Sequence, residues 1–423
     1  MDVAVAKGEA GRQGHAPTLV ASFLHFDLSF MLWVLPGALG VYIAESLALS
    51  PGEKGLVVAV PILSGALLRI PLGLLSDRFG AKRVGVAMLL VLFLPLSLGW
   101  QAGDSLGAWL GIGLLLGTAG ASFAVALPLA SRWYPAERQG LVMGIAAAGN
   151  SGTVIANLAA PRLANLIGWH NVLGVAMVPL AIVLAVFLLL AKDGPAPVKG
   201  TPSPAANFGG VLRQPALWGL CLLYCVTFGG YVGMTSFFPI FIRSEYGLSP
   251  LTGGYLTALV AFCGSCVRPA GGYLADRFGG VTVLSVLLVL IGGLYALLAM
   301  LPAIWVLMAL ACATFVCLGL GNGSVFQLVP RRFMTEIGAA TGIVGALGGL
   351  GGFLLPILLG NVKGMSGSFA LGFVALSLFC LAVLFVLRVL AATSEEWRTS
   401  WGTAATPAST RPLPRVEMAP YLL

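Results

Sequence analysis

Apolar stretches of about twenty residues recur from one end of this chain to the other. Each is long enough to cross the ~30 Å hydrocarbon core of a bilayer as an α-helix, which rises about 1.5 Å per residue. Charged residues make up only 9% of the 423 residues, whereas they form about a quarter of a typical soluble domain. The sequence therefore predicts an all-α membrane protein that crosses the bilayer many times.

Breaks at glycine, proline and charged residues divide the chain into twelve predicted membrane spans. These are 19–43, 55–75, 84–102, 107–130, 140–167, 171–191, 216–242, 252–275, 281–301, 303–330, 338–360 and 368–391. A linker rich in proline and glycine, residues 192–215, separates one half of six spans (19–191) from a second half of six spans (216–391). Residues 1–18 and 392–423 form the two tails, and the first tail lacks the features of a removable signal peptide.

The distribution of positive charge predicts the orientation. If both termini are cytoplasmic, seventeen of the 23 lysines and arginines lie on the cytoplasmic side, at positions 7, 12, 78, 82, 83, 132, 138, 192, 199, 213, 277, 331, 332, 388, 398, 411 and 415. The external side then carries Lys54, Arg162, Arg243 and Lys363. This asymmetry follows the positive-inside rule for an inner (cytoplasmic) membrane, so the net charge of +8 needs no nucleic-acid partner.

The two halves share internal sequence. Residues 69–80 (RIPLGLLSDRFG) and 268–279 (RPAGGYLADRFG) are identical at seven of twelve positions, with a constant offset of 199. A second similarity, at an offset of 202, relates 120–128 (GASFAVALP) to 322–330 (NGSVFQLVP). Repeats of this kind are typical of alternating-access transporters, whose substrate binds at the midplane between the halves.

This arrangement resembles the major facilitator superfamily. The stretch GLLSDRFGAKR (73–83) is similar to that superfamily's signature loop between the second and third spans, and GYLADRFGG in the second half keeps most of it. Asp77 stands at the C-terminal end of its helix, where the helix dipole opposes a carboxylate, so we expect a gating latch rather than an interfacial anchor. The predicted gating residues are Asp77 and Arg78 in one half and Asp276 and Arg277 in the other.

Two arginines, Arg69 and Arg268, stand at equivalent places inside otherwise apolar spans. An arginine near the centre of a span costs about 2.5–3.5 kcal/mol on membrane-insertion scales. Arg69 lies roughly 9 Å from the cytoplasmic end of its span, and it leans toward the midplane because side chains lean toward a helix's N-terminus. We therefore favour substrate binding over the two alternatives, snorkelling to the interface and a structural ion pair.

The chemistry of a guanidinium points to an anion. It is permanently charged, and its planar fork of donors suits a planar oxyanion bound through two hydrogen bonds. Together with Asp27, the one acidic candidate inside a span, Arg69 and Arg268 leave a net positive charge in the membrane interior. Such a site is best neutralised by one small monovalent anion, and a cationic substrate would have no partner there.

A second resemblance narrows the anion. The glycine-rich segments 117–152 and 342–356 are similar to the paired nitrate-signature segments of the nitrate/nitrite porter family, and 26–45 is similar to that family's first span. The resemblance implies an anion held between two arginines, aromatic faces and an amide. The implied substrate-binding residues are Arg69, Arg268, Phe30, Phe123, Asn150, Tyr224 and Phe228. For the phenylalanines, ordinary packing is the alternative.

Two polar residues carry separate hypotheses. Asn150 stands among glycines in a span, where an amide has few structural reasons to be, whereas the equivalent run 349–352 has no asparagine. An amide is therefore expected from one half only. Asp27 lies near the depth of Arg69 and is the proton-coupling candidate, with His25 as a relay. The alternatives are that Asp27 is a fixed counter-ion to an arginine, and that transport is an exchange of nitrate for nitrite.

The function implied by the resemblance is secondary active transport of nitrate, with nitrite as a further substrate, by alternating access and proton-coupled uptake. A nitrate receptor that does not transport, and a facilitator for another small anion such as a carboxylate, stay open. The sequence contains no cofactor loop, no nucleophile–base pairing and no cluster of metal ligands, so neither an enzyme, a cofactor nor a metal site is expected. A monomer is the superfamily's usual state.

Overall fold

A computed structural model of the chain describes residues 14–101, 105–134, 142–143, 145–194, 208–333 and 337–400. Within these ranges the regular elements are helical, as the sequence predicts. They are α2 (Ala16–Ala38), α3 (Gly40–Ser46), α4 (Pro51–Phe79), α5 (Ala81–Gln101), α6 (Leu106–Gly120), α7 (Phe123–Ser131), η1 (Ala148–Ser151), α9 (Gly152–Ile167), α10 (Trp169–Leu190), α11 (Phe208–Leu212), α12 (Pro215–Tyr224), η3 (Cys225–Gly229), α13 (Gly230–Tyr246), α14 (Pro250–Cys266), α15 (Arg268–Phe278), α16 (Gly280–Leu298), α17 (Ile304–Arg332), α18 (Ile337–Ser366), α19 (Ala370–Thr393) and α20 (Glu395–Arg398).

Eleven helical segments of the described chain are long and apolar enough to cross a membrane. They correspond to every predicted span except 140–167. That region holds α9, of 16 residues, preceded by the 3₁₀ turn η1, while residues 140, 141 and 144 lie outside the described ranges. The prediction of an all-α membrane protein with two six-span halves is therefore confirmed, and its fifth span is interrupted by a turn.

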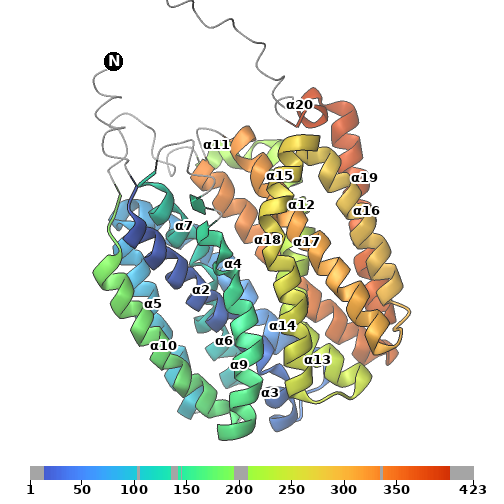
Figure 1. The fold of residues 1–423 in the computed structure, drawn as a ribbon. Helices are drawn as coiled ribbons and strands as arrows, with labels where there is room; N and C mark the ends of the chain where they lie inside the picture. Colours follow the sequence, from blue (N-terminus) through green and yellow to red (C-terminus); the bar gives the residue numbers. More distant parts are fainter. Residues whose placement is uncertain are drawn as a thin grey trace, which may run out of the picture.

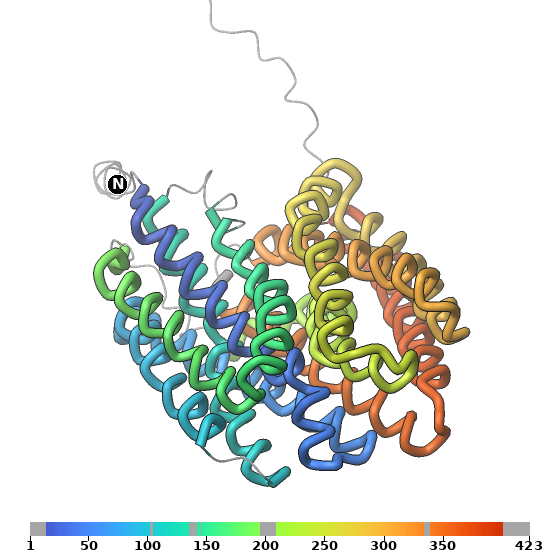
Figure 2. Tube along the Cα trace, turned by 60° about the horizontal axis from the view of Figure 1, so that its bottom comes forward, coloured from blue at the N-terminus to red at the C-terminus, as the bar shows by residue number. Residues whose placement is uncertain are grey.

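The helices form two groups that lie side by side (Figure 1). Helices α2 to α10, blue to green, make the N-terminal half, and α12 to α19, light green to red, make the C-terminal half; Figure 2 shows the same division from another direction. The start of α2 lies at the same end of the bundle as α20, and this end is called the termini end below. The connection between α3 and α4 lies at the opposite end.

The outer surface of the bundle carries large apolar side chains. Helices α5, α10, α16 and α19 expose leucine, valine and phenylalanine along their length, for example Leu94, Val178, Leu189, Val289 and Phe385. In water, an apolar surface of this extent would promote aggregation. The distribution of these side chains around the bundle suits contact with lipid. Polar and charged groups in the interior of a membrane protein are costly, and such groups point to a function.

The most extensive contacts between the halves are made by α4 with α18, by α9 with α14 and by α2 with α13. Glycine permits this close approach. A side chain at Gly55 of α4 would clash with the carbonyl of Pro356, and one at Gly254 of α14 would clash with the carbonyl of Asn157. Small residues of this kind let helix backbones pack tightly in membranes, where no hydrophobic force drives helices together.

The halves are held together at the end opposite the termini. There, Arg243 Nε of α13 lies 2.8 Å from Glu45 Oε1 of α3, so an ion pair crosses between the halves. Close approaches between α4 and α18 continue inward from Pro51 as far as Arg69. One end of the interface is therefore closed to about the depth of that arginine.

Candidate substrate-binding site

Arg69 lies where the two halves meet, and only 1% of it is exposed. Its Nε donates to the carbonyl of Gly120 over 3.1 Å, and its Nη1 donates to the carbonyl of Gly345 over 2.6 Å. Gly120 is the last residue of α6, where carbonyls have no partner in the helix and the helix dipole is negative. Gly345 belongs to α18 of the other half, so the guanidinium links the halves.

Three aromatic rings surround the same guanidinium. Cζ of Arg69 lies 5.5 Å from the ring centroid of Trp33, 5.5 Å from that of Phe123 and 4.9 Å from that of Phe228. These rings come from α2, α7 and η3, and therefore from both halves. Each cation–π contact contributes about 0.5–2 kcal/mol, with the larger values in desolvated sites such as this one. The rings thus replace part of the hydration that the charge loses.

One donor group of Arg69 is left over. Its Nη2 atom is buried and has no hydrogen-bond partner among the described residues. A buried polar group without a partner costs about 1–3 kcal/mol, and a charged one costs more. An anion beside Nη2 would remove this cost. The geometry therefore leaves one donor group of Arg69, its Nη2, available to a ligand.

Arg268 enters the site from a helix break. It is the first residue of α15, directly after Val267, and is followed by Pro269. Proline disfavours helical geometry at the residue before it, which explains why the eighth span divides here into α14 and α15. Arg268 is only partly buried, unlike Arg69.

The two arginines belong to one site. The Arg268 side chain lies close to the hydroxyl of Tyr224, and it is close enough to Arg69 for the two positive charges to interact. Neither arginine has an ion-pair partner in the described part of the chain. The site therefore carries uncompensated positive charge, which favours an anionic ligand.

Tyr224 and Phe228, two of the predicted binding residues, stack on each other. Their ring centroids are 4.8 Å apart and their planes differ by 1°. Tyr224 ends α12, and Phe228 lies in η3, a π-helical turn of the kind often found at functional sites. The tyrosine ring also meets Phe326 of α17 edge to face, with 4.9 Å between centroids.

Asn150 has an unusual environment for an amide. It is 1% exposed, and neither its Nδ2 nor its Oδ1 has a hydrogen-bond partner among the described residues. It sits in η1, whose neighbouring glycines pack so closely on α2 that a side chain at Gly149 or Gly152 would clash with the backbone of Asp27. The 3₁₀ turn thus presents a buried amide that lacks a partner in the described chain.

The predicted phenylalanines divide into two roles. Phe123 contacts the Arg69 guanidinium, and its ring also lies 5.4 Å from Phe326 across the interface. Phe30 contacts Phe26 at 4.8 Å and Trp33 at 5.1 Å, and is not one of the rings around Arg69. Phe30 therefore supports the site from behind Trp33.

Several contributors to the site have no strong signal in the sequence. Trp33 follows Phe30 by three residues on the same face of its helix, and this spacing could have identified it. Phe326 reads as an ordinary apolar residue of its span. The carbonyl groups of Gly120 and Gly345 bind Arg69, but a backbone group leaves no mark on the residue pattern.

Asp27 lies against η1 rather than beside an arginine. Its Oδ1 accepts a hydrogen bond from Ser151 Oγ over 2.6 Å, and the backbone N–H of Gly152 lies close to its carboxylate. Among the described residues it makes no ion pair, so the geometry does not support a fixed counter-ion to an arginine. His25 lies elsewhere: its Nε2 is 3.2 Å from the Gly85 carbonyl, and its ring packs on Phe187.

In the N-terminal half, Asp77 forms an ion pair with Arg132, just beyond the end of α7. This pair lies at the termini end and stays within one half. Arg78 is exposed, with its guanidinium 5.1 Å from the ring of Phe79. Asp77 is therefore engaged with a basic residue that the sequence had not singled out, and Arg78 is not its partner.

The C-terminal half repeats this arrangement. Asp276 Oδ1 lies 2.8 Å from Arg331 Nη2 and also accepts a hydrogen bond from Gln327 Nε2 over 2.8 Å. Arg277 is exposed, and its guanidinium is 5.3 Å from the ring of Phe278. Each half thus carries its own acidic–basic pair at the termini end.

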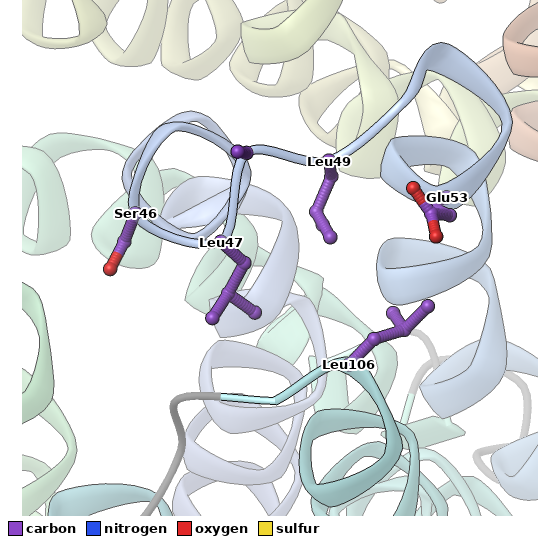
Figure 3. Close-up of a pocket in the computed structure, with 6 residues that line it drawn as sticks. Ser46, Leu47, Leu49, Glu53 and Leu106 are labelled. Carbon is purple, nitrogen blue, oxygen red and sulfur yellow. The ribbon is translucent and has the colours of Figure 1, made fainter.

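Two cavities at the opposite end do not contain the arginines. The first, of 480 Å³, is lined by Ser46, Leu47, Ala48, Leu49, Glu53 and Leu106 (Figure 3). Its Glu53 carboxylate is occupied by the backbone and hydroxyl of Ser50, so this cavity does not suit an anion. The second, of 310 Å³, lies between the halves and includes Lys54 and Lys363. Lys363 is already paired with Glu245 at 2.9 Å.

The fold and the site together define a class of protein. Two repeated helical halves that enclose a buried charged site at their interface form a membrane transport protein, in which the site is reached alternately from either side. The chain matches the model of the Major Facilitator Superfamily over residues 21–356 and belongs to that superfamily. It is a transporter and not an enzyme.

Relatives of known description cover almost the whole chain. The chain is 37% identical to the nitrite extrusion protein of Bacillus subtilis (strain 168), over 88% of this chain and 93% of that protein. It is 32% identical to the probable nitrate transporter NarT of Staphylococcus haemolyticus (85% and 93%) and 36% identical to the probable nitrate/nitrite transporter NarK2 of Mycobacterium tuberculosis (82% and 89%). The resemblance to the nitrate/nitrite porter family is therefore confirmed.

Solved structures share the fold at low sequence identity. A bacterial homologue of the human lysosomal transporter Spinster, in an inward-facing and occupied conformation, matches with a TM-score of 0.68 and 18% identity over 90% of this chain and 97% of that one. The human organic anion transporter MFSD10 matches with a TM-score of 0.65 and 16% identity, over 88% and 99%. These matches bear on the fold alone.

Proposed function

We propose that this protein transports nitrate, with nitrite as a second substrate, across the cytoplasmic membrane by alternating access. It acts as a monomer with both termini in the cytoplasm. The observation that carries the proposal is the guanidinium of Arg69, which is fully buried yet keeps Nη2 without a partner in the described chain. A donor of this kind suits a small planar oxyanion, and relatives described as nitrate or nitrite transporters support the choice of anion.

Two further donors suit the same ligand. The Arg268 guanidinium has no carboxylate partner in the described ranges, and neither polar atom of the buried Asn150 amide has a hydrogen-bond partner there, so both groups are free to donate to the proposed anion. Bound anion would satisfy donors on both halves at once. It would also reduce the repulsion between Arg69 and Arg268. Loaded protein can therefore bring the halves together more readily than empty protein, which is what alternating access requires.

Uptake into a cell needs a driving force. Moving one negative charge inward against the membrane potential costs about 2.3 kcal/mol per 100 mV. We propose that protons supply this energy through Asp27, whose carboxylate accepts a hydrogen bond from Ser151, in the turn that also carries Asn150. A shift of η1 on anion binding would change this hydrogen bond, and with it the affinity of Asp27 for a proton.

The proposal is tested with purified protein in proteoliposomes. Labelled nitrate should accumulate when the outside is made acidic, and unlabelled nitrate and nitrite should compete with it. Formate serves as the control for a facilitator of another small anion. Strong competition by formate together with weak competition by nitrate would contradict the proposed substrate.

The coupling is tested in the same vesicles with Asp27→Asn. This variant should no longer accumulate nitrate under a pH gradient, while exchange of internal for external nitrate persists. The exchange in the variant is its own control for folding. Accumulation that survives in Asp27→Asn would remove Asp27 from the coupling step. Wild-type transport that responds only to nitrite on the opposite side would favour nitrate/nitrite exchange instead.

A further inference from the structure

A second buried amide in the bundle lacks a partner in the described chain. Asn322 of α17 is fully buried, and neither its Nδ2 nor its Oδ1 makes a hydrogen bond within the described ranges. It belongs to the C-terminal half, whereas the sequence led us to expect an amide from the N-terminal half only. An unpaired amide in a membrane interior is costly, so a ligand that binds it would be stabilising.

The contacts of the two halves fix how Asn322 relates to the repeat. Asp77 pairs with Arg132, and Asp276 pairs with Arg331. Asp276 comes 199 residues after Asp77, and Arg331 comes 199 residues after Arg132. The fourth and tenth spans are therefore related by 199, the offset of the arginine repeat. The offset of 202 taken from the sequence similarity does not match these contacts.

A glycine contact supports the same register. The residue nearest to a side chain placed at Gly73 is Ala124, and the residue nearest to one placed at Gly272 is Gly323. Gly272 and Gly323 again come 199 residues after Gly73 and Ala124, respectively. With this offset, Asn322 is the counterpart of Phe123, whose ring lies 5.5 Å from Cζ of Arg69. In the N-terminal half, this position is the one that contacts Arg69. Asn322 occupies the equivalent position in the C-terminal half.

The neighbours of Asn322 bring it to the level of the site. A side chain at Gly323 would clash with the carbonyl of Arg268, and one at Gly321 would clash with Thr227 of η3. The tenth span thus passes between the helix break that carries Arg268 and the turn that carries Phe228.

The face of α17 that carries Asn322 looks toward the other half. Phe326 follows Asn322 by four residues and so shares its side of the helix. The Phe326 ring lies 4.9 Å from Tyr224 and, across the interface, 5.4 Å from Phe123. Asn322 is one turn farther from the termini end on this inward face.

We propose that Asn322 is a substrate-binding residue, whose Nδ2 donates to an oxygen of the small oxyanion held by Arg69 and Arg268. The proposal rests on the proposed function. With Asn150, it gives the site one neutral amide from each half. A neutral donor fits here because the two guanidinium groups already supply more positive charge than one monovalent anion neutralises.

The test compares Asn322→Leu with wild-type protein. Leucine has a similar volume but no donor, so the packing of α17 is kept while the hydrogen bond is lost. The readouts are the nitrate concentration that half-saturates uptake in proteoliposomes and the rise in melting temperature that nitrate gives purified protein. Loss of a hydrogen bond to a charged ligand should weaken nitrate binding by about tenfold or more in both readouts.

Thr314→Val is the matched control on the same helix. Thr314 is also buried, but its hydroxyl is satisfied by the carbonyl of Leu310, so nitrate binding should be unchanged. If Asn322 only stabilises the fold, Asn322→Leu would melt at a lower temperature while nitrate still raised its melting temperature as much as in wild type. That result would overturn the proposal.

Asn322→Asp covers the case in which the leucine variant does not fold. It keeps the shape of the side chain and replaces the donor by a carboxylate that repels an anion, so nitrate stabilisation should be lost. Nitrate affinity equal to wild type in this variant would contradict the proposal. If wild-type protein itself neither binds nor transports nitrate, the proposed function fails instead, which separates the two outcomes.

Discussion

The two halves present the same arginine in different ways. In the N-terminal half, Arg69 is 1% exposed, bound by two carbonyl groups and surrounded by three rings. In the C-terminal half, Arg268 is partly buried and its side chain lies close to the hydroxyl of Tyr224. Residues that are equivalent in the repeat are therefore unequal in the site.

The positions of prolines explain this difference. In α4, Pro71 lies two residues after Arg69, and the helix continues without a break from Pro51 to Phe79. In the other half, Pro269 follows Arg268 directly, and the helix divides at Val267. An unbroken helix holds its arginine in one place, whereas a break leaves the backbone beside Arg268 freer to adjust.

The difference suggests a division of labour. Arg69 is already fixed and keeps one donor group without a partner in the described chain, so under the proposed function its role would be to hold the anion at the interface. Arg268 has fewer contacts to lose, so under the proposed function it would follow the anion when the halves move. Variants that affect a fixed and an adjustable arginine differently can test this distinction.

The largest effects are expected from Arg69→Lys and Arg268→Lys. An ammonium keeps the charge but loses the planar fork, so each variant should lower nitrate uptake by about 100-fold or more. The two should differ in stability. Arg69→Lys loses contacts to Gly120 and Gly345 and should melt at a lower temperature than wild type, whereas Arg268→Lys should melt close to wild type.

Uptake rate and thermal melting of the purified variants measure these two properties. Equal melting temperatures for the two lysine variants would contradict the idea that Arg69 is the fixed member. Near-normal uptake in either variant would mean that charge alone is enough, and that the planar geometry of the guanidinium is not required.

A smaller effect is expected from Asn150→Ala. Loss of one amide donor should weaken nitrate binding by about 1–2 kcal/mol, or roughly 5- to 30-fold. Phe123→Leu should weaken it less, because the ring contacts the arginine rather than donating to the anion. Nitrate-dependent uptake curves give both values. The reverse order would show that the aromatic ring, and not the amide, determines affinity.

The sequence predicted the helical halves and the paired arginines because these follow from chemistry that acts on residue types. Apolar runs of this length are characteristic of membrane spans, and a charge inside one of them is costly enough to indicate a function. The repeat at an offset of 199 then related Arg69 to Arg268, and the structure brings the two guanidinium groups close enough for their charges to interact.

The sequence could not predict contacts made by backbone groups or by side chains that have several ordinary roles. Gly120 and Gly345 bind Arg69 through their carbonyls, which every residue possesses. Asn322 escaped notice because the sequence similarity at an offset of 202 related it to a glycine. Three-dimensional contacts were needed to find that its counterpart is Phe123.

The smallest effects are expected from the acidic–basic pairs at the termini end. Exposed ion pairs contribute about 0–1 kcal/mol, so neither Asp77→Asn nor Asp276→Asn should change the melting temperature or nitrate affinity much. The uptake rate should fall more for Asp77→Asn, because 26% of the Asp77 side chain is exposed, against 61% for Asp276. Asp276→Asn also keeps an acceptor for Gln327.

Initial rates at saturating nitrate measure the effect. Asp193→Asn is the control, since Asp193 accepts a hydrogen bond from Lys82 N at the same end and lies outside both pairs. Equal uptake rates for Asp77→Asn and Asp276→Asn would mean that the two ion pairs contribute equally to transport, although the two arginines differ in their environments.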